Sequence, residues 1–323
     1  MSRWMFWTAA TVVSWGVWAV LAKAIGDSLS DAQKQALSTV GMVPVVLTFV
    51  LSKDLAVRGA GRRGVLYALL AGVVSGLANV PYYALVAHEK AAAVVPLTAL
   101  YPVVTIALAA AFLNERVNRV QAVGLALALA AIYLFNVSEE SGLLSGWLGY
   151  AFVPMALWGA AAFLQKLATA HLSDKLAALL VVVGFLLTNL GLMAAGPWPG
   201  EVTPRTWALV AALGFFLAFG NYTVVLAYAT GKASVVTPLA GLYPVVSVPV
   251  ALLVFKETVG PRTAAGIVCA LAAVLALSFE APPRLPAEPS AAGCPSGPTA
   301  AGAADRDHRA AKASETNDPI RGS

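Results

Sequence analysis

Charged residues are scarce in this 323-residue sequence. Only 11% of positions are Asp, Glu, Lys or Arg, 59% are hydrophobic, and the mean hydropathy is +0.77. An average soluble domain carries about 25% charged residues, so most of this chain cannot cover a surface with water-compatible side chains. The net charge of +5 is not gathered into a basic face or groove. The composition therefore excludes a soluble fold for most of the chain, and it excludes nucleic acid as a partner.

Residues suited to catalysis or metal binding are equally few. The two cysteines, Cys269 in an apolar run and Cys294 near the C-terminus, give neither a disulfide framework nor a metal-binding spacing. The three histidines are scattered, at positions 88, 171 and 308. Nothing resembles a nucleophile elbow or a phosphate-binding glycine loop. We therefore expect no enzyme activity, no cofactor and no metal.

Long apolar runs fill the first 279 residues instead. A bilayer core requires about 20 apolar residues per helix. The runs are rich in Ala, Leu and Val, without the alternation of a membrane barrel, and helices satisfy their own backbone groups in lipid. The sequence thus predicts an all-α polytopic membrane protein in the lipid bilayer. Its ten expected transmembrane helices lie near 4–25, 34–51, 65–86, 91–113, 119–135, 147–167, 176–195, 206–228, 234–255 and 261–279.

Residues 280–323 differ from the rest of the chain. They hold 11 of the 37 charged residues and 7 of the 19 prolines. Such a segment cannot bury enough apolar surface to offset the entropy of ordering, so we expect a disordered cytoplasmic tail. Ten loop Lys and Arg residues lie on the side of the N-terminus and five on the opposite side. This bias predicts that both termini are cytoplasmic, in a plasma (inner) membrane.

An internal repeat is the strongest pattern in the sequence. Residues 94–104 read VVPLTALYPVV and residues 236–246 read VTPLAGLYPVV, so eight of eleven positions match at a spacing of 142. Nearer the N-terminus the spacing becomes 143. The repeat divides the chain into two five-helix units, 1–137 and 138–279.

An odd number of helices in each unit has a topological consequence. The second unit must enter the membrane from the side opposite to the first, which gives inverted-topology repeats related by a pseudo-two-fold axis in the membrane plane. Two such halves can exchange conformations, so that a central site opens first to one side and then to the other. The repeat therefore favours an alternating-access transporter.

These motifs resemble those of a known family. Each Pro-Leu-x-x-Leu-Tyr-Pro-Val-Val segment is followed by an acidic residue, Glu115 or Glu257, and then by a glycine-bearing helix. The arrangement is similar to the two EamA-type repeats of the drug/metabolite transporter superfamily, over about residues 4–279. The resemblance implies ten helices in two five-helix units. It also implies a carrier of amino acids, metabolites, sugars or drugs.

Aromatic and amide residues within the apolar runs come in repeat-related pairs. Tryptophans near mid-membrane, asparagines beside small residues and tyrosines next to prolines could line a cavity or serve helix packing. For the asparagines the two interpretations are evenly matched. We expect a solute-binding site formed by Trp15, Asn79, Tyr101, Trp158, Asn221 and Tyr243.

Four prolines are expected to kink the fourth and ninth helices, because proline removes a backbone hydrogen bond. They are Pro96, Pro102, Pro238 and Pro244. Freed carbonyls at membrane depth are tolerated where they line a cavity. We therefore expect these helices to border the solute pathway, with kinks that only shape packing as the alternative.

Two lysines, Lys23 and Lys166, are the sharpest polar pair and lie near the ends of their helices. Each either extends to the membrane interface or binds an anionic or zwitterionic solute at a mouth of the pathway. Glu115 and Glu257 are expected to stabilise a helix N-terminus. No Asp or Glu lies in the middle third of an expected helix, which disfavours proton-coupled export of cationic drugs.

The sequence as a whole predicts a secondary transporter for a small polar or amphipathic solute, such as an amino-acid-like metabolite. A multidrug exporter is one alternative. A non-transporting membrane sensor or scaffold that acts through the C-terminal tail is another.

Overall fold

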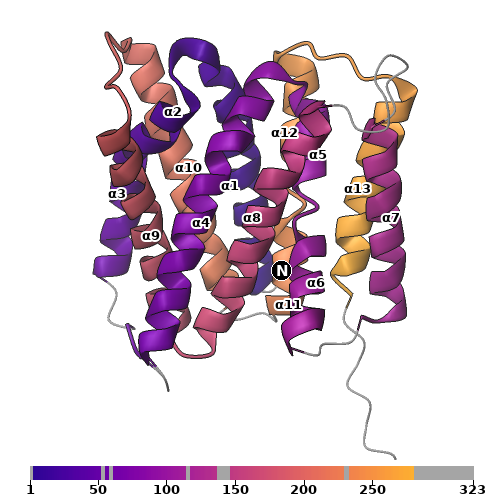
Figure 1. The fold of residues 1–323 in the computed structure, drawn as a ribbon, viewed down its shortest axis with the longest axis horizontal. Coiled ribbons are helices and arrows are strands. Elements are labelled where there is room, and N and C mark those ends of the chain that lie inside the picture. The colour runs from indigo at the N-terminus through magenta and orange to yellow at the C-terminus, as the bar shows by residue number, and fades with distance from the viewer. Residues whose placement is uncertain are drawn as a thin grey trace, which may run out of the picture. The chain divides into compact units, whose positions relative to one another are not determined.

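The computed structural model describes residues 3–51, 55–57, 61–113, 117–136, 146–228 and 233–279. Apart from an isolated β-bridge between Val57 and Leu172, regular structure in these ranges is helical (Figure 1). The first repeat contains α1 (Arg3–Ile25), η1 (Gly26–Ser28), α2 (Asp31–Leu37), α3 (Thr39–Val50), α4 (Gly61–His88), α5 (Ala91–Thr98), α6 (Pro102–Leu113) and α7 (Arg119–Asn136). The second contains α8 (Gly146–Thr169), α9 (Asp174–Ala195), α10 (Pro204–Tyr228), α11 (Ala233–Ala240), α12 (Pro244–Val254) and α13 (Pro261–Leu277).

Six helical stretches in the described ranges are long and apolar enough to cross a membrane: Arg3–Ser28, Gly61–His88, Ala91–Phe112, Gly146–Thr169, Lys175–Ala195 and Pro204–Val224. Three shorter apolar helices are Arg119–Phe135, Pro238–Val254 and Pro261–Leu277. Large side chains such as Leu51, Phe112 and Leu253 are exposed, which suits lipid rather than water. The expectation of a helical membrane protein is confirmed at this level.

Three of the expected transmembrane segments are interrupted. Segment 34–51 is divided into α2 and α3 at Ser38, whose hydroxyl donates to the carbonyl of Gln35. Segments 91–113 and 234–255 are each divided at the Tyr-Pro motif, so that Pro102 begins α6 and Pro244 begins α12. Proline fits the first turn of a helix because the missing N–H has no intrahelical partner there. Pro96 and Pro238 lie inside α5 and α11.

The most extensive helix contacts cross between the two repeats. Helix α1 packs on α10 and its counterpart α8 packs on α4, while α3 packs on α10 and α9 packs on α4. Helices α7 and α13, which are also counterparts, lie side by side (Figure 1). The first repeat therefore packs mainly against the second, and the chain as far as Ala281 forms one compact unit.

Close helix approach depends on small residues in matching places. A Cβ atom built on Gly72 of α4 would meet the backbone of Val181 and Gly184 on α9. In the other repeat, a Cβ on Gly214 of α10 would meet the backbone at Ser38. Only glycine permits this separation, as is usual for packed membrane helices.

Candidate solute-binding site

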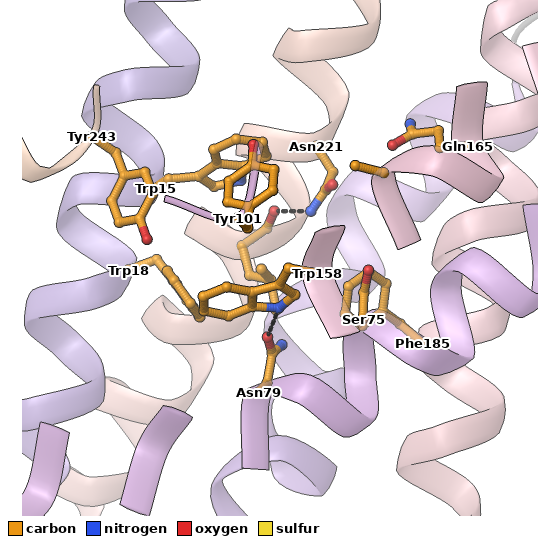
Figure 2. Close-up of a pocket in the computed structure, with 12 residues that line it drawn as sticks. Trp15, Trp18, Ser75, Asn79, Tyr101, Trp158, Gln165, Phe185, Asn221 and Tyr243 are labelled. Atoms are coloured by element: carbon orange, nitrogen blue, oxygen red, sulfur yellow. Dashed lines mark hydrogen bonds between the residues drawn. The ribbon is translucent and has the colours of Figure 1, made fainter. Parts of the chain in front are cut away.

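A cavity lies at the centre of the described helices (Figure 2). Counted as the space that the centre of a water molecule can reach, its volume is about 100 Å³. All six residues that the repeat pattern proposed for a binding site line it. They are Trp15, Asn79, Tyr101, Trp158, Asn221 and Tyr243.

Two tryptophan–tyrosine pairs line the cavity, and each pair joins a residue of one repeat to a residue of the other. Trp15 of the first repeat lies edge-to-face on Tyr243 of the second, with ring centroids 6.4 Å apart. Trp158 of the second repeat packs in the same manner on Tyr101 of the first, at 6.5 Å. Edge-to-face contacts place the positive rim of one ring on the negative face of another. The breaks before Pro102 and Pro244 thus bring each tyrosine to the tryptophan of the opposite repeat.

A glycine follows each tryptophan and makes this approach possible. A Cβ atom on Gly16 would lie 2.5 Å from Cβ of Val246 and 3.1 Å from the carbonyl oxygen of Tyr243. A Cβ atom on Gly159 would lie 2.5 Å from Cβ of Val104 and 2.9 Å from the carbonyl oxygen of Tyr101. Each Trp-Gly motif therefore packs closely against the Tyr-Pro break of the opposite repeat.

Asn79 belongs to a buried chain of side-chain hydrogen bonds. The indole N–H of Trp158 donates to Oδ1 of Asn79 at 3.1 Å (Figure 2). Nδ2 of Asn79 donates to Oε1 of Gln35 at 3.0 Å, and Nε2 of Gln35 donates to Oδ1 of Asn189 at 2.7 Å. Because an indole only donates, Trp158 fixes the direction of the whole chain.

A side branch joins this chain to a second aromatic group. The hydroxyl of Tyr83 donates to Oε1 of Gln35 at 3.2 Å and accepts from the indole of Trp18 at 3.2 Å. Trp18 also stacks on Tyr82, with ring centroids 4.9 Å apart. Gln35, Tyr82 and Tyr83 are fully buried. The first-repeat asparagine is thus held by a network whose residues lie on five helices, α1, α2, α4, α8 and α9.

Asn221, the repeat counterpart of Asn79, is held differently. Its Nδ2 donates to the carbonyl oxygen of Leu217 on its own helix at 2.8 Å (Figure 2). Asn79 is fully buried, whereas Asn221 is partly exposed. One asparagine therefore ties helices together, and the other bonds to its own helix.

Sequence reasoning missed further lining residues, chiefly Trp18, Ser75, Gln165 and Phe185. Helical spacing could have found three of them. Trp18 is three residues after Trp15, Ser75 is four before Asn79, and Gln165 is seven after Trp158, so each shares a face with a proposed residue. Their repeat counterparts are not polar or aromatic in the same way, and the search for matching pairs passed over them.

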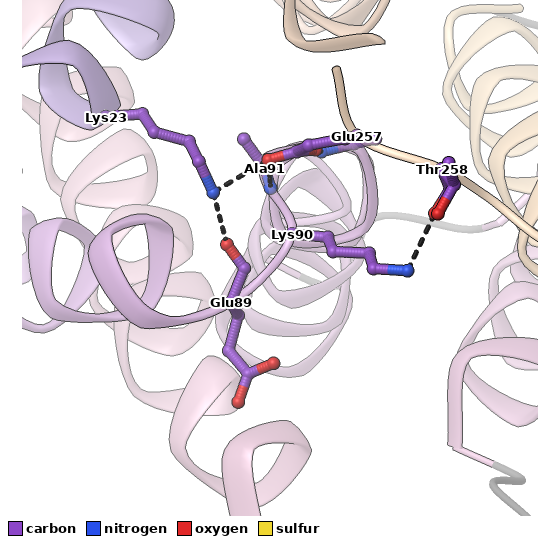
Figure 3. A network of polar contacts seen from close by, with 7 residues as sticks. Lys23, Glu89, Lys90, Ala91, Glu257 and Thr258 are labelled. Carbon is purple, nitrogen blue, oxygen red and sulfur yellow. Dashed lines mark hydrogen bonds and ion pairs between the residues drawn. The ribbon is translucent and has the colours of Figure 1, made fainter. Parts of the chain in front are cut away.

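Lys23 and Lys166 do not line the cavity. The ammonium group of Lys23 pairs with Oε1 of Glu257 at 2.7 Å and donates to the backbone carbonyl of Glu89 at 2.7 Å (Figure 3). The side chain of Lys23 is 18% exposed and that of Glu257 is 7% exposed, so the pair is shielded. Lys166 is exposed at the end of α8.

Glu257 stabilises a helix N-terminus, but in the opposite repeat. Its two carboxylate oxygens accept from the backbone N–H groups of Ala91 and Ala92 at 3.0 and 2.9 Å, at the start of α5 (Figure 3). A carboxylate there satisfies two free donors and offsets the positive end of the helix dipole. Nearby, Nζ of Lys90 donates to the carbonyl of Thr258. Glu115 lies outside the described residues.

The two ends of the cavity differ. On α8 the face after Trp158 continues the cavity lining through Ala162 to Gln165. On α1 the equivalent residues after Trp15 are Ala19 and Ala22, and both have no exposed surface. The cavity therefore extends toward the end of α8 that carries Lys166, and it is packed shut toward the end of α1 that carries Lys23.

Apolar spanning helices, a duplicated architecture and a central solute-sized cavity define a helical integral membrane protein of the transporter class. The EamA-like transporter family model matches this chain twice, over residues 2–137 and 145–279. The chain belongs to this family, as the sequence motifs indicated, and is a membrane transporter of the drug/metabolite transporter superfamily.

Two individual proteins are also similar to this chain. An uncharacterized protein of Methanocaldococcus jannaschii is 25% identical over 127 residues, which is 91% of that protein and 39% of this chain. A solved crystal structure matches with a TM-score of 0.59 and 16% identity, over 85% of this chain and 96% of that one. At that identity the likeness shows the fold alone. The archaeal relative is close to the length of one repeat.

Proposed function

We propose that this protein is a secondary transporter that carries a small organic solute through the central cavity by alternating access between two inverted five-helix halves. One observation carries the proposal. The same face of two repeat-related helices lines the cavity in α8, through Ala162 and Gln165, and is packed shut in α1, at Ala19 and Ala22. Two halves of one design in opposite conformations are what alternating access requires.

The closed end is held by the shielded ion pair described above. Lys23 comes from the end of α1, Glu89 from the α4–α5 junction and Glu257 from the segment after α12, so three parts of the chain meet there (Figure 3). Opening this end must separate Lys23 from Glu257. In a partly shielded site the separation costs more free energy than it does for a surface pair, because the attraction between the two charges is stronger in a lower dielectric.

The excess of basic loop residues on the side of the N-terminus assigns each end of the cavity to one side of the membrane. With cytoplasmic termini, Gln165 faces the cytoplasmic end and Lys23 the opposite one. We infer that the structure is the inward-facing state. In the outward-facing state the roles reverse: Ala22 becomes accessible and the path past Gln165 closes.

Cysteine accessibility tests this proposal. In a background with Cys269→Ser and Cys294→Ser, Gln165→Cys and Ala22→Cys are labelled with a membrane-impermeant thiol reagent from each side of sealed vesicles. Gln165→Cys should react from the cytoplasmic side only. Ala22→Cys should be protected, and adding Lys23→Met should raise its labelling rate from the opposite side at least tenfold while Gln165→Cys becomes slower.

A matched control is Lys90→Met, which removes a cation at the same end that contacts Thr258 rather than Glu257. It should leave the labelling of Ala22→Cys within about twofold of the background. If both lysine variants act alike, the ion pair is not the closure. If Ala22→Cys stays protected while purified protein exchanges solute across vesicles, the alternating mechanism is wrong.

A further inference from the structure

We propose that helix α2 is the gate at the closed end of the cavity, and that Gln35 is the positioning residue through which the cavity wall holds this gate shut. The inference rests on the proposed function and assigns the closure of that end to one element. Helix α2 follows α1 at the end that carries Lys23, after the short turn η1. The ion pair of Lys23 with Glu257 secures the same end from α1.

A break separates α2 from α3. At this break the hydroxyl of Ser38 donates to the carbonyl of Gln35 at 2.6 Å, and the hydroxyl of Thr39 donates to the carbonyl of Ala36 at 2.8 Å. Hydroxyl groups that bond back to the preceding turn bend helices. The two parts have different neighbours, since α2 packs mainly on α9 and α4 whereas α3 packs mainly on α10. A bend at this break therefore moves α2 while α3 stays on α10.

A directed chain of hydrogen bonds runs from the cavity wall to this break. Its first three bonds, described above, join Trp158, Asn79, Gln35 and Asn189 (Figure 2). Nδ2 of Asn189 then donates to the hydroxyl of Thr39 at 2.8 Å, and that hydroxyl donates to Ala36. Every link donates in the same direction, from an indole that only donates to a carbonyl that only accepts. Because Trp158 lines the cavity, the chain connects the solute site with the break.

Gln35 is the link of the chain that belongs to α2. It is fully buried and bonds to Asn79 and Tyr83 of α4 and to Asn189 of α9. These bonds must all break when α2 moves away from α4 and α9. Since each holds a buried polar group that would otherwise lack a partner, together they favour the closed position. A solute that displaces the indole of Trp158 removes the donor to Asn79 and so weakens the hold on α2.

The second repeat shows that the shared fold does not require this chain. Helix α9, the counterpart of α2 and α3, runs without a break from Asp174 to Ala195. The residues at the positions equivalent to Gln35, Ser38 and Thr39 are apolar: Ala178, Val181 and Val182. The indole nitrogen of Trp15, the counterpart of Trp158, is buried without a hydrogen-bond partner in the described part of the chain. The break and the chain are thus confined to the end that is closed in this structure.

Hydrogen exchange of backbone amides measures the gate in the full-length protein in lipid nanodiscs. Gln35→Met keeps a side chain of similar length and removes its amide. It should speed the exchange of α2 about fivefold, as expected for the loss of a neutral hydrogen bond from the closed state, and leave α3 within about twofold of the unmodified protein. Labelling of Ala22→Cys from the closed end should rise by a similar factor.

Substitutions at the cavity wall show whether the chain acts over a distance. Trp158→Phe keeps a ring and removes the donor to Asn79, so it should speed the exchange of α2 about threefold, although Trp158 lies on α8. Trp15→Phe is the matched control, because it makes the same change at an indole outside the chain. It should leave the exchange of α2 unchanged.

Thr39→Val cuts the chain at its far end with little change in side-chain volume. Thermal melting identifies a Gln35→Met protein that fails to fold, and Thr39→Val then takes its place. Thr39→Val should speed the exchange of α2 as Trp158→Phe does. When the two are combined, the effect should be smaller than the product of the separate fold-changes, because each already interrupts the same chain.

The results also separate this inference from the proposed function. Unchanged exchange of α2 in folded Gln35→Met or Thr39→Val, or equal effects of Trp158→Phe and Trp15→Phe, would overturn it. If Lys23→Met exposes Ala22→Cys and Gln35→Met does not, alternating access stands and α2 is not its gate. If neither variant exposes Ala22→Cys, the proposed function itself fails.

Discussion

The two repeats share their Trp-Gly and Tyr-Pro motifs but differ in what surrounds them. In the second repeat, the face of α8 beyond Trp158 opens onto the cavity and carries Gln165. In the first repeat, the same face of α1 carries Ala22 and is sealed. The shared motifs build the contact between the halves, and the unshared residues determine how each half is used.

The same distinction holds at the asparagines. Asn79 is part of a network through Gln35 to Asn189, while Asn221 bonds only to its own helix in the described contacts. A duplicated residue is therefore not a duplicated role. We infer that Asn79 helps to join the two repeats, because its network includes Trp158 and Asn189 of the second one, whereas Asn221 serves its own helix.

The largest effect on stability is expected where the two repeats are most alike, at the Trp-Gly motifs. Gly159→Val places a branched side chain against Val104 and the carbonyl of Tyr101, and overpacking of this kind costs about 3 kcal/mol. The melting temperature of the purified protein should fall by on the order of 10 °C. Gly149→Val on the same helix, where a Cβ atom meets nothing within 4 Å, should change it little.

The equivalent substitution in the first repeat sharpens this result. A Cβ atom on Gly16 would lie 2.5 Å from Cβ of Val246, which is the distance between a Cβ atom on Gly159 and Cβ of Val104. Gly16→Val should therefore lower the melting temperature by a similar amount. If Gly16→Val keeps the melting temperature of the unmodified protein and Gly159→Val does not, the two Trp-Gly motifs are not equivalent.

An intermediate effect is expected at the asparagines, where the halves differ. Asn79→Leu leaves the indole of Trp158 without its acceptor and removes one of the two donors to Oε1 of Gln35, which should cost about 1–2 kcal/mol. Asn221→Leu should cost less than about 0.5 kcal/mol, because Leu217 retains its helical backbone bond. Unfolding of both variants in mixed detergent measures the difference, and equal losses would show that the two asparagines have the same structural role.

The smallest effect on stability is expected at Gln165, whose repeat counterpart is Ala22. Gln165→Ala gives α8 the residue that α1 has at the equivalent position, and it should change the free energy of unfolding by less than about 0.5 kcal/mol, as is usual for a partly exposed side chain. Calorimetry on the purified variant measures this change. Abolished folding would show that Gln165 has a packing role that its partial exposure does not indicate.

Much of the molecule could be predicted from the sequence. The apolar runs predicted membrane helices, and the family motifs predicted the EamA-like family, because both depend on local composition and spacing. The duplicated pattern also selected six residues that the structure brings to one cavity. The count of ten spans and the inverted arrangement of the halves stay predictions.

Two features were beyond local patterns. Gln35 looks like an ordinary residue in the first turns of a helix, and its partners Asn79 and Asn189 lie 44 and 154 residues away. Periodicity carries no information about such distant pairing. The partner of Lys23 was missed for the same reason, and the sealing of Ala22 depends on the conformation of the whole protein rather than on its neighbours in sequence.

The interlocked packing of the repeats has a consequence for biosynthesis. Helices enter the membrane in the order of translation, yet α1 packs chiefly on α10 and Lys23 pairs with Glu257. The first repeat must therefore wait in the bilayer, with its mating faces on lipid, until nearly all of the membrane part has been made. Insertion and tertiary assembly are therefore separate events in this protein, and a ribosome stalled midway would leave a first repeat whose packing partner has not been made.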